Sequence, residues 1–147
     1  MTISHLFKQA EKRALQSRKP NTKVGALLLD KNDEVILEAC NDYIHPVYDS
    51  ENTESAQDKK MYSEHAERHL IYSAIRFGIH EFQDKKLVVT HFPCCDCARA
   101  IILIGIKKLL VKAQSSDENF HRKWKGNIDV SHRMLIQNNV EIHFFDK

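Results

Sequence analysis

Apolar positions along the 147-residue chain change spacing from one segment to the next. Residues 1–17, MTISHLFKQAEKRALQS, repeat apolar side chains every three or four positions, which predicts an amphipathic helix. The expected buried face of this helix consists of Ile3, Leu6, Phe7, Ala10, Ala14 and Leu15. Two apolar runs follow, KVGALLLD and EVILEAC, and the short polar link KND between them is typical of a β-hairpin.

The chain then becomes polar and irregular from residue 41 to about 63. Loops of this length inside a compact domain are uncommon and often act as lids or binding loops, although a mobile surface insertion fits equally well. Helical spacing returns in EHAERHLIYSAIRFG and again in CCDCARAIILIG, each ended by a glycine. KKLVVTHF, IKKLLVKA and VEIHFF have strand character, and residues 117–138 predict one helix broken at Gly126 or two short helices.

This order of elements predicts an α/β fold. A strand that reaches the next strand through a helix normally becomes its parallel neighbour. We therefore expect one domain over residues 1–147, a three-layer α-β-α sandwich with a five-stranded mixed sheet whose last strands are parallel. Ligands bind such sheets beyond the carboxyl ends of the parallel strands, where the following helices begin.

Composition limits the classes of binding partner and the cellular compartments that fit this chain. Acidic and basic residues are interspersed and the net charge is +2, which argues against a large nucleic-acid surface but allows a small phosphate pocket. No apolar run is long enough to span a bilayer. The four cysteines are too unevenly placed for a disulfide framework, and nothing resembles a secretory signal, so we expect a cytoplasmic protein.

Three of those cysteines lie in the stretch FPCCDCA, residues 92–98. Cys94 and Cys97 are three positions apart, so in a first helical turn their sulfurs face the same way, while Cys95 points elsewhere and is expected to pack as a small apolar side chain. A redox pair, a structural metal site and a catalytic metal site all use CxxC. A structural zinc needs four protein ligands and a catalytic zinc needs three.

The sequence HAE at the start of the preceding helix suggests the missing ligand. Residues two apart do not share a helical face, so His65 and Glu67 can serve one site only if His65 lies at the helix entrance. His65, Cys94 and Cys97 would then form a zinc set with an open fourth position, beside which the Glu67 carboxylate could move protons.

The combination H-x-E…P-C-x-x-C is the signature of zinc nucleobase deaminases. Over nearly its whole length the chain resembles the cytidine/deoxycytidylate deaminase superfamily, most of all its deoxycytidylate (dCMP) deaminase branch, through PNTKVGALLLD, HAERHLIYSAIRFGI, VVTHFPCCDCARAIILIGIKKLLV and ML…NNVEI. The resemblance implies a cytidine deaminase-like fold, a Zn²⁺ cofactor, Glu67 as proton shuttle, hydrolysis of dCMP to dUMP and ammonia, and a homo-oligomer. It also implies substrate-binding positions at Asn41, Thr22, Val24, Ala66 and Pro93.

Departures from the family pattern leave the substrate open. Asp42 follows the asparagine where glycine is usual, the next proline is Pro46, and His69 and Leu70 stand where asparagine and alanine are common. The alternatives are a deaminase of another free base or nucleoside (cytidine, guanine or another purine), a tRNA-type polynucleotide deaminase, and a scaffold with structural zinc. Cys40 is expected to pack as a small buried side chain rather than to act as a ligand. Contacts to the pocket are the less favoured alternative to an ordinary structural role for five further residues: His45, Tyr48, Tyr62, His91 and Trp124.

Overall fold

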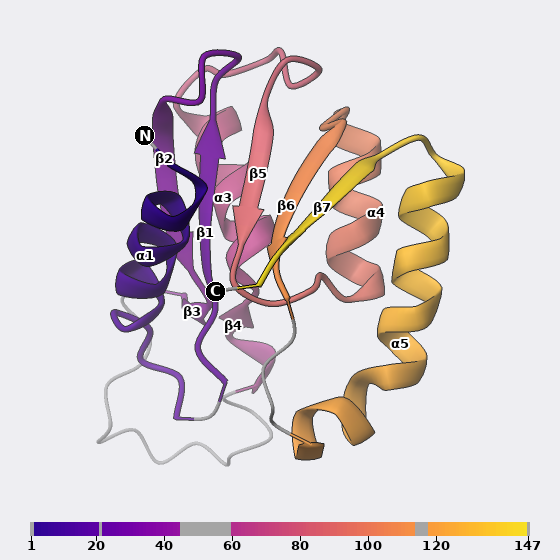
Figure 1. The fold of residues 1–147 in the computed structure, drawn as a ribbon. Coiled ribbons are helices and arrows are strands. Elements are labelled where there is room, and N and C mark those ends of the chain that lie inside the picture. Colours follow the sequence, from indigo (N-terminus) through magenta and orange to yellow (C-terminus); the bar gives the residue numbers. More distant parts are fainter. Residues whose placement is uncertain (1, 21, 45–59, 114–117, 147) are drawn as a thin grey trace.

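A computed structural model describes residues 2–20, 22–44, 60–113 and 118–146 of the chain (Figure 1). Its helices are α1 (Ile3–Ala14), α3 (Ala66–Arg76), α4 (Cys95–Ile104) and α5 (Glu118–Gln137). Its strands are β1 (Gly25–Leu29), β2 (Val35–Cys40), β3 (Asp42–Tyr43), β4 (Ser63–Glu64), β5 (Lys86–Val89), β6 (Lys108–Lys112) and β7 (Glu141–Phe145).

Five of these strands form one mixed sheet in the order β2-β1-β5-β6-β7. Strand β1 runs antiparallel to both of its neighbours, β2 and β5, whereas β5, β6 and β7 are parallel. The predicted hairpin, the mixed sheet and the parallel last strands are thus confirmed. Each parallel pair is connected through a helix, as a crossover connection requires.

Helices cover both faces of the sheet (Figure 1). On one face, α1 buries Leu6, Phe7 and Ala10 against alternate residues of the central strands, including Leu27 and Val88. Helices α3 and α4 pack on the opposite face, in a second core cluster that Leu135 of α5 also joins. The three-layer arrangement follows from the period of two in the strands, which sends successive apolar side chains to opposite layers.

Three expectations about these elements are wrong. Ile3 and Leu15 were expected in the core but are 47% and 75% exposed, because they lie at the two ends of α1, beyond the sheet. Helix α5 is continuous through Gly126. One glycine inside a helix costs only about 1 kcal/mol, and α5 contributes the fully buried side chains of Ser131 and Leu135 to the fold.

The polar segment 41–63 is described only at its two ends. There the two-residue strands β3 and β4 pair antiparallel, with Asp42 opposite Glu64. Both strands adjoin residues expected in the site, Asn41 and His65, so this ribbon links two parts of one region. His45, Pro46 and Tyr48 lie outside the described residues. Within the described part of the chain, no helix is long and apolar enough to cross a membrane.

Candidate active site

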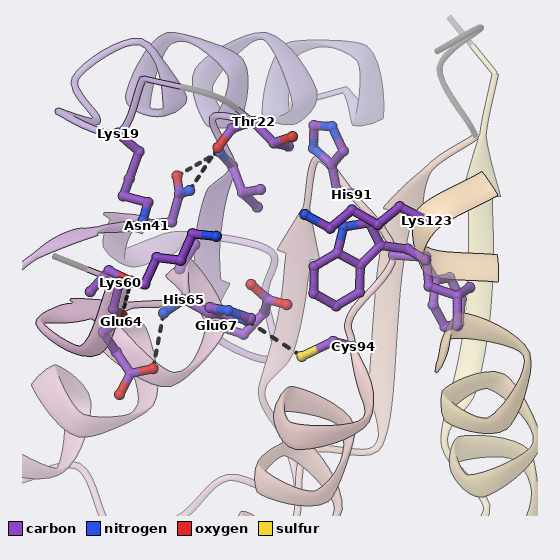
Figure 2. Close-up of a pocket in the computed structure, with 16 residues that line it drawn as sticks. Lys19, Thr22, Asn41, Lys60, Glu64, His65, Glu67, His91, Cys94 and Lys123 are labelled. Atoms are coloured by element: carbon purple, nitrogen blue, oxygen red, sulfur yellow. Dashed lines mark hydrogen bonds between the residues drawn. The ribbon is translucent and has the colours of Figure 1, made fainter. Parts of the chain in front are cut away.

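A cavity of about 440 Å³ opens where α3 and α4 begin (Figure 2). Its walls come from segments far apart in sequence: residues 19–24 before β1, Asn41 after β2, residues 63–67 at the start of α3, residues 91–94 before α4, and one face of α5. The volume is in the range of small-molecule sites. The site thus lies where the sheet topology predicted a ligand.

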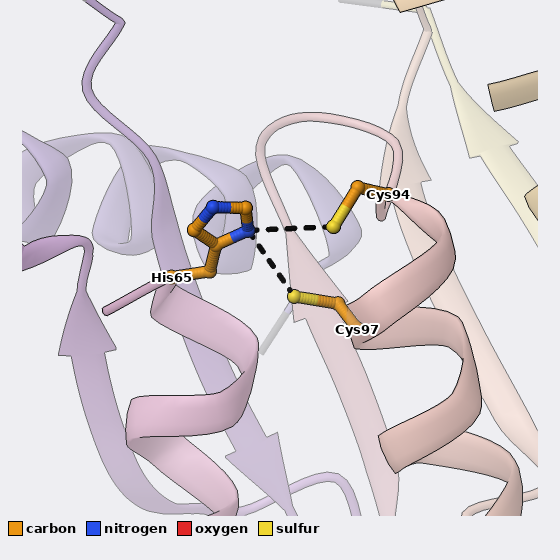
Figure 3. Close-up of side chains that lie close together, drawn as sticks. All are labelled: His65, Cys94 and Cys97. Atoms are coloured by element: carbon orange, nitrogen blue, oxygen red, sulfur yellow. Dashed lines mark hydrogen bonds between the residues drawn. The ribbon is translucent and has the colours of Figure 1, made fainter. Parts of the chain in front are cut away.

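His65, Cys94 and Cys97 meet at the floor of this region (Figure 3). His65 and Cys94 are the N-cap residues of α3 and α4, and neither side chain caps its own helix. The Nδ1 atom of His65 lies 3.4 Å from Sγ of Cys94 and 3.5 Å from Sγ of Cys97. A tetrahedral zinc with ordinary Zn–N and Zn–S bonds holds such atoms about 3.6 Å apart, so the three side chains fit the metal.

Electrostatics around the two thiols favour ligation. Hydrogen bonding from the Cys97 thiol, together with His65 and against the effect of burial, lowers the pKa of Cys94 to about 4. The same contact raises the pKa of Cys97, because its thiol donates a hydrogen bond to Cys94 and because burial disfavours a second thiolate there. One thiolate is therefore ready at neutral pH, and a bound cation would displace the remaining proton.

Glu67 occupies the first turn of α3, and its side chain is buried, only 4% exposed. Figure 2 shows its carboxylate facing the cavity between His65 and Cys94. Burial raises the pKa of Glu67 above its usual range, because a charged carboxylate is poorly solvated there. A carboxyl group with a raised pKa can both release and accept a proton near neutral pH, so Glu67 is suited to proton transfer.

Arg68 connects the starts of helices α3 and α4. Its guanidinium lies 2.6 Å from Glu64 and 3.7 Å from Asp96 of α4. Despite partial burial, its pKa is raised, first by the nearby Cys97 and then by Glu64. A fixed cation beside a sulfur stabilises the thiolate, so Arg68 supports the charge that the metal site needs.

The residues expected at the substrate are mostly found around the cavity. Thr22, Val24, Asn41 and Ala66 line it, whereas Pro93 is buried between two lining residues and does not line the cavity itself. The side chain of Asn41 accepts a hydrogen bond from the Val24 N–H and donates one to the Thr22 carbonyl, both at 2.8 Å. Asn41 therefore shapes this wall, a role that the sequence pattern alone did not suggest.

Sequence reasoning underestimated the contribution of α5 and of the end of β5. Trp124 and His91 both line the cavity, although packing was the favoured interpretation for each. Lys123 and Ile128 join Trp124 from the same face of α5. Trp124 and Ile128 are four positions apart and therefore share a helical face, so this spacing could have grouped these two residues once one of them was suspected.

The remaining cysteines and the unusual Leu70 are accounted for by packing and hydrogen bonds. Cys40 is buried, 2% exposed, as expected. The expectation that Cys95 belongs to the core is wrong: it is half-buried, and its thiol lies 3.1 Å from the Asn127 carbonyl oxygen and donates to it. Leu70 is fully buried in the core cluster with α4 and does not line the cavity.

Helix α5 is tied directly to the turn that carries the cysteines. Asn127 accepts a hydrogen bond at 2.8 Å from the Cys95 N–H, one of the free donors at the start of α4. Ser131, which is fully buried, donates to the Pro93 carbonyl at 2.7 Å. These two bonds hold the cavity wall formed by Trp124 against the metal-binding turn.

The Ser131→Ala variant should lose about 1–3 kcal/mol of unfolding free energy, because the buried Pro93 carbonyl loses its donor. We also expect weaker zinc binding, by roughly tenfold, since outer groups orient metal ligands. Chemical denaturation and zinc competition with a chromogenic chelator measure the two effects. Ser4→Ala on α1 serves as the control, and equal behaviour of the two variants would contradict the role of Ser131.

Comparison with known proteins identifies the family to which the chain belongs. Residues 1–113 match the family model described as the cytidine and deoxycytidylate deaminase zinc-binding region. The chain belongs to this deaminase family. Zinc is the family's metal, and His65, Cys94 and Cys97 are the described residues that could hold it.

Named relatives agree with this deaminase assignment. The "uncharacterized deaminase in luxG 3'region" of Aliivibrio fischeri is 35% identical over 136 residues, which cover 92% of this chain and 88% of that protein. A probable deoxycytidylate deaminase of Drosophila melanogaster is 29% identical over 80% of this chain and 62% of its own length. The crystal structure of the dCMP deaminase of cyanophage S-TIM5, in complex with dCMP and dUMP, matches with a TM-score of 0.74 at 21% identity, covering 99% of each chain. This last likeness confirms the cytidine deaminase-like fold.

Proposed function

We propose that this deaminase hydrolyses a cytosine nucleotide, most specifically dCMP to dUMP and ammonia, with residues 1–147 acting as one domain. The observation that carries the proposal is the buried Glu67 carboxylate beside three side chains that could hold a metal, at the floor of the cavity. Two named deoxycytidylate deaminases among the relatives and the dCMP-bound structural neighbour support the choice of nucleotide.

In this proposal His65, Cys94 and Cys97 hold a zinc ion, which supplies a water activated for attack at neutral pH. Two thiolates and one neutral imidazole would balance the ion's charge. The fit of the ligand set rests on the 3.4 and 3.5 Å separations of the nitrogen and sulfur atoms. Every other task falls to groups of the chain itself.

Glu67 moves the protons. Its carboxylate would take a proton from the attacking water and deliver it to ring N3 of cytosine as the new C4–O bond forms. It would then pass the second water proton to the amino group, so that the C4–N bond breaks and ammonia leaves. Water and dCMP are consumed and dUMP and ammonia are formed, with no net change in protons.

The cavity walls would hold the substrate for this step. We assign the sugar-facing wall to Asn41, Thr22 and Val24, whose mutual hydrogen bonds preorganise it. Ala66 lines the cavity between the metal ligand and the proton shuttle, where its small side chain leaves room for a flat base. Pro93 would act by setting the turn before Cys94. The cytoplasmic location stays a prediction from the cysteine pattern, and the homo-oligomeric state stays a prediction from the resemblance.

Ammonia release from a panel of compounds tests the proposal. The zinc-loaded chain should act on dCMP with a kcat/KM above that for CMP, deoxycytidine, cytosine, guanine and adenosine. Preference for guanine or a nucleoside would replace the proposed substrate by another small molecule. Turnover of a tRNA stem-loop alone would contradict a small-molecule deaminase.

A further inference from the structure

Three lysines from three separate segments line the same cavity. Lys19 precedes β1, Lys60 precedes β4, and Lys123 lies on α5. Figure 2 shows Lys60 and Lys123 reaching toward each other from opposite sides, with Lys19 on the side of Lys60 and with Glu67 and Cys94 below them in the view. Three separate parts of the fold thus bring ammonium groups to one opening.

The carboxylates of the described residues do not neutralise this group. Within that part of the chain, none of the three lysines forms an ion pair. Of the two acidic lining residues, Glu64 is already bound to Arg68 and to its neighbour's backbone N–H. Glu67 is buried at the floor of the cavity. The lysines therefore leave positive charge at the opening.

The surroundings of the lysines are consistent with a prepared anion site. Burial, and secondly repulsion by Lys60, lower the pKa of Lys19, against a smaller attraction by Asp42, whose carboxylate is paired with Arg18. Aromatic rings lie under two of the ammonium groups: Tyr43 at 4.9 Å from Lys19 and Trp124 at 5.9 Å from Lys123. Such rings hold a cation without neutralising it. An anion placed between the lysines would relieve their mutual repulsion.

We propose that Lys19, Lys60 and Lys123 form a binding site for the 5′-phosphate of a nucleoside monophosphate. The proposal rests on the proposed function, because it places the base of the substrate at Glu67 and the phosphate at the opening. A 5′-phosphate carries between one and two negative charges at neutral pH and offers several acceptor oxygens, which suits ammonium groups arriving from several directions. The site would favour a nucleotide over a nucleoside by strengthening substrate binding. It would not take part in the chemical step.

Neutral variants of nearly equal length test this assignment. Lys19→Met, Lys60→Met and Lys123→Met should each lower kcat/KM for dCMP roughly ten- to a hundredfold, while kcat/KM for deoxycytidine changes less than about twofold. Lys125→Met is the matched control, since Lys125 lies on the same helix and pairs with Asp129 outside the cavity. An equal fall for nucleotide and nucleoside, or no fall for either, would overturn the proposal.

Binding measurements separate this proposal from the proposed reaction. Calorimetric titration of the zinc-loaded chain with dUMP and deoxyuridine needs no turnover. Tighter binding of dUMP in the unaltered chain and its loss in the three variants would support the phosphate site, even if no compound of the panel is deaminated. Equal affinity for dUMP and deoxyuridine would refute it, and so would tighter binding of a single-stranded oligonucleotide than of dUMP.

Discussion

Replacing Glu67 by glutamine is expected to lower kcat/KM for dCMP by roughly a hundred- to ten-thousandfold while the zinc stays bound. Glutamine has nearly the same shape as glutamate, so the cavity keeps its form. It cannot accept the proton of the attacking water or carry it to the base. Because Glu67 is buried beside the metal-binding residues, bulk solvent has poor access to replace it in this role.

Steady-state ammonia release and metal analysis by atomic emission measure the two halves of this prediction. Glu81→Gln is the matched control, because Glu81 is exposed and does not line the cavity. Loss of zinc from the Glu67→Gln variant would identify Glu67 as a ligand and rule out the proton-shuttle role. Activity within about tenfold of the unaltered chain would also contradict that role.

Serine in place of either Cys94 or Cys97 should remove both the zinc and the activity. A hydroxyl is a far poorer ligand than a thiolate, and only His65 and one sulfur would remain among the described ligands. Zinc should raise the melting temperature of the unaltered chain by binding the folded state, and this rise should vanish in both variants. Metal content per chain should fall from about one to near zero.

Cys95→Ser provides the control within the same turn. The Cys95 side chain bonds the Asn127 carbonyl, and a serine hydroxyl can keep that bond. We expect full zinc content, the zinc-dependent rise in melting temperature and unaltered activity. A loss of metal in Cys95→Ser equal to that in Cys94→Ser would show that the wrong pair of cysteines has been assigned.

Much of the fold could be predicted because local patterns and topology agree. Apolar residues at spacing three and four marked α1, α3 and α4, and β-branched runs marked the strands. The helix break predicted at Gly126 is absent, because at this position local preference and tertiary packing disagree. Local propensity favours an interruption there, but burial of Ser131 and Leu135 keeps α5 continuous, and a tertiary contact of this kind has no local signal.

The sequence by itself determined where the residues proposed to react would meet. HAE and PCxxC are short, each lies at a helix start, and the order of elements brings those starts to one end of the sheet. The placement of Glu67 beside the three residues that could hold a metal therefore followed from local spacing and connectivity.

Only the tertiary structure decided what surrounds that chemistry. Lys19, Lys60 and Lys123 line the cavity together, although no spacing rule connects their segments. Trp124, which was expected to pack elsewhere, also lines it. The structure also shows the Asn41 amide hydrogen-bonded to the backbone of Val24 and Thr22, and it places Leu70 in the core. Substrate contacts depend on packing between distant elements, and such contacts are absent from any local pattern.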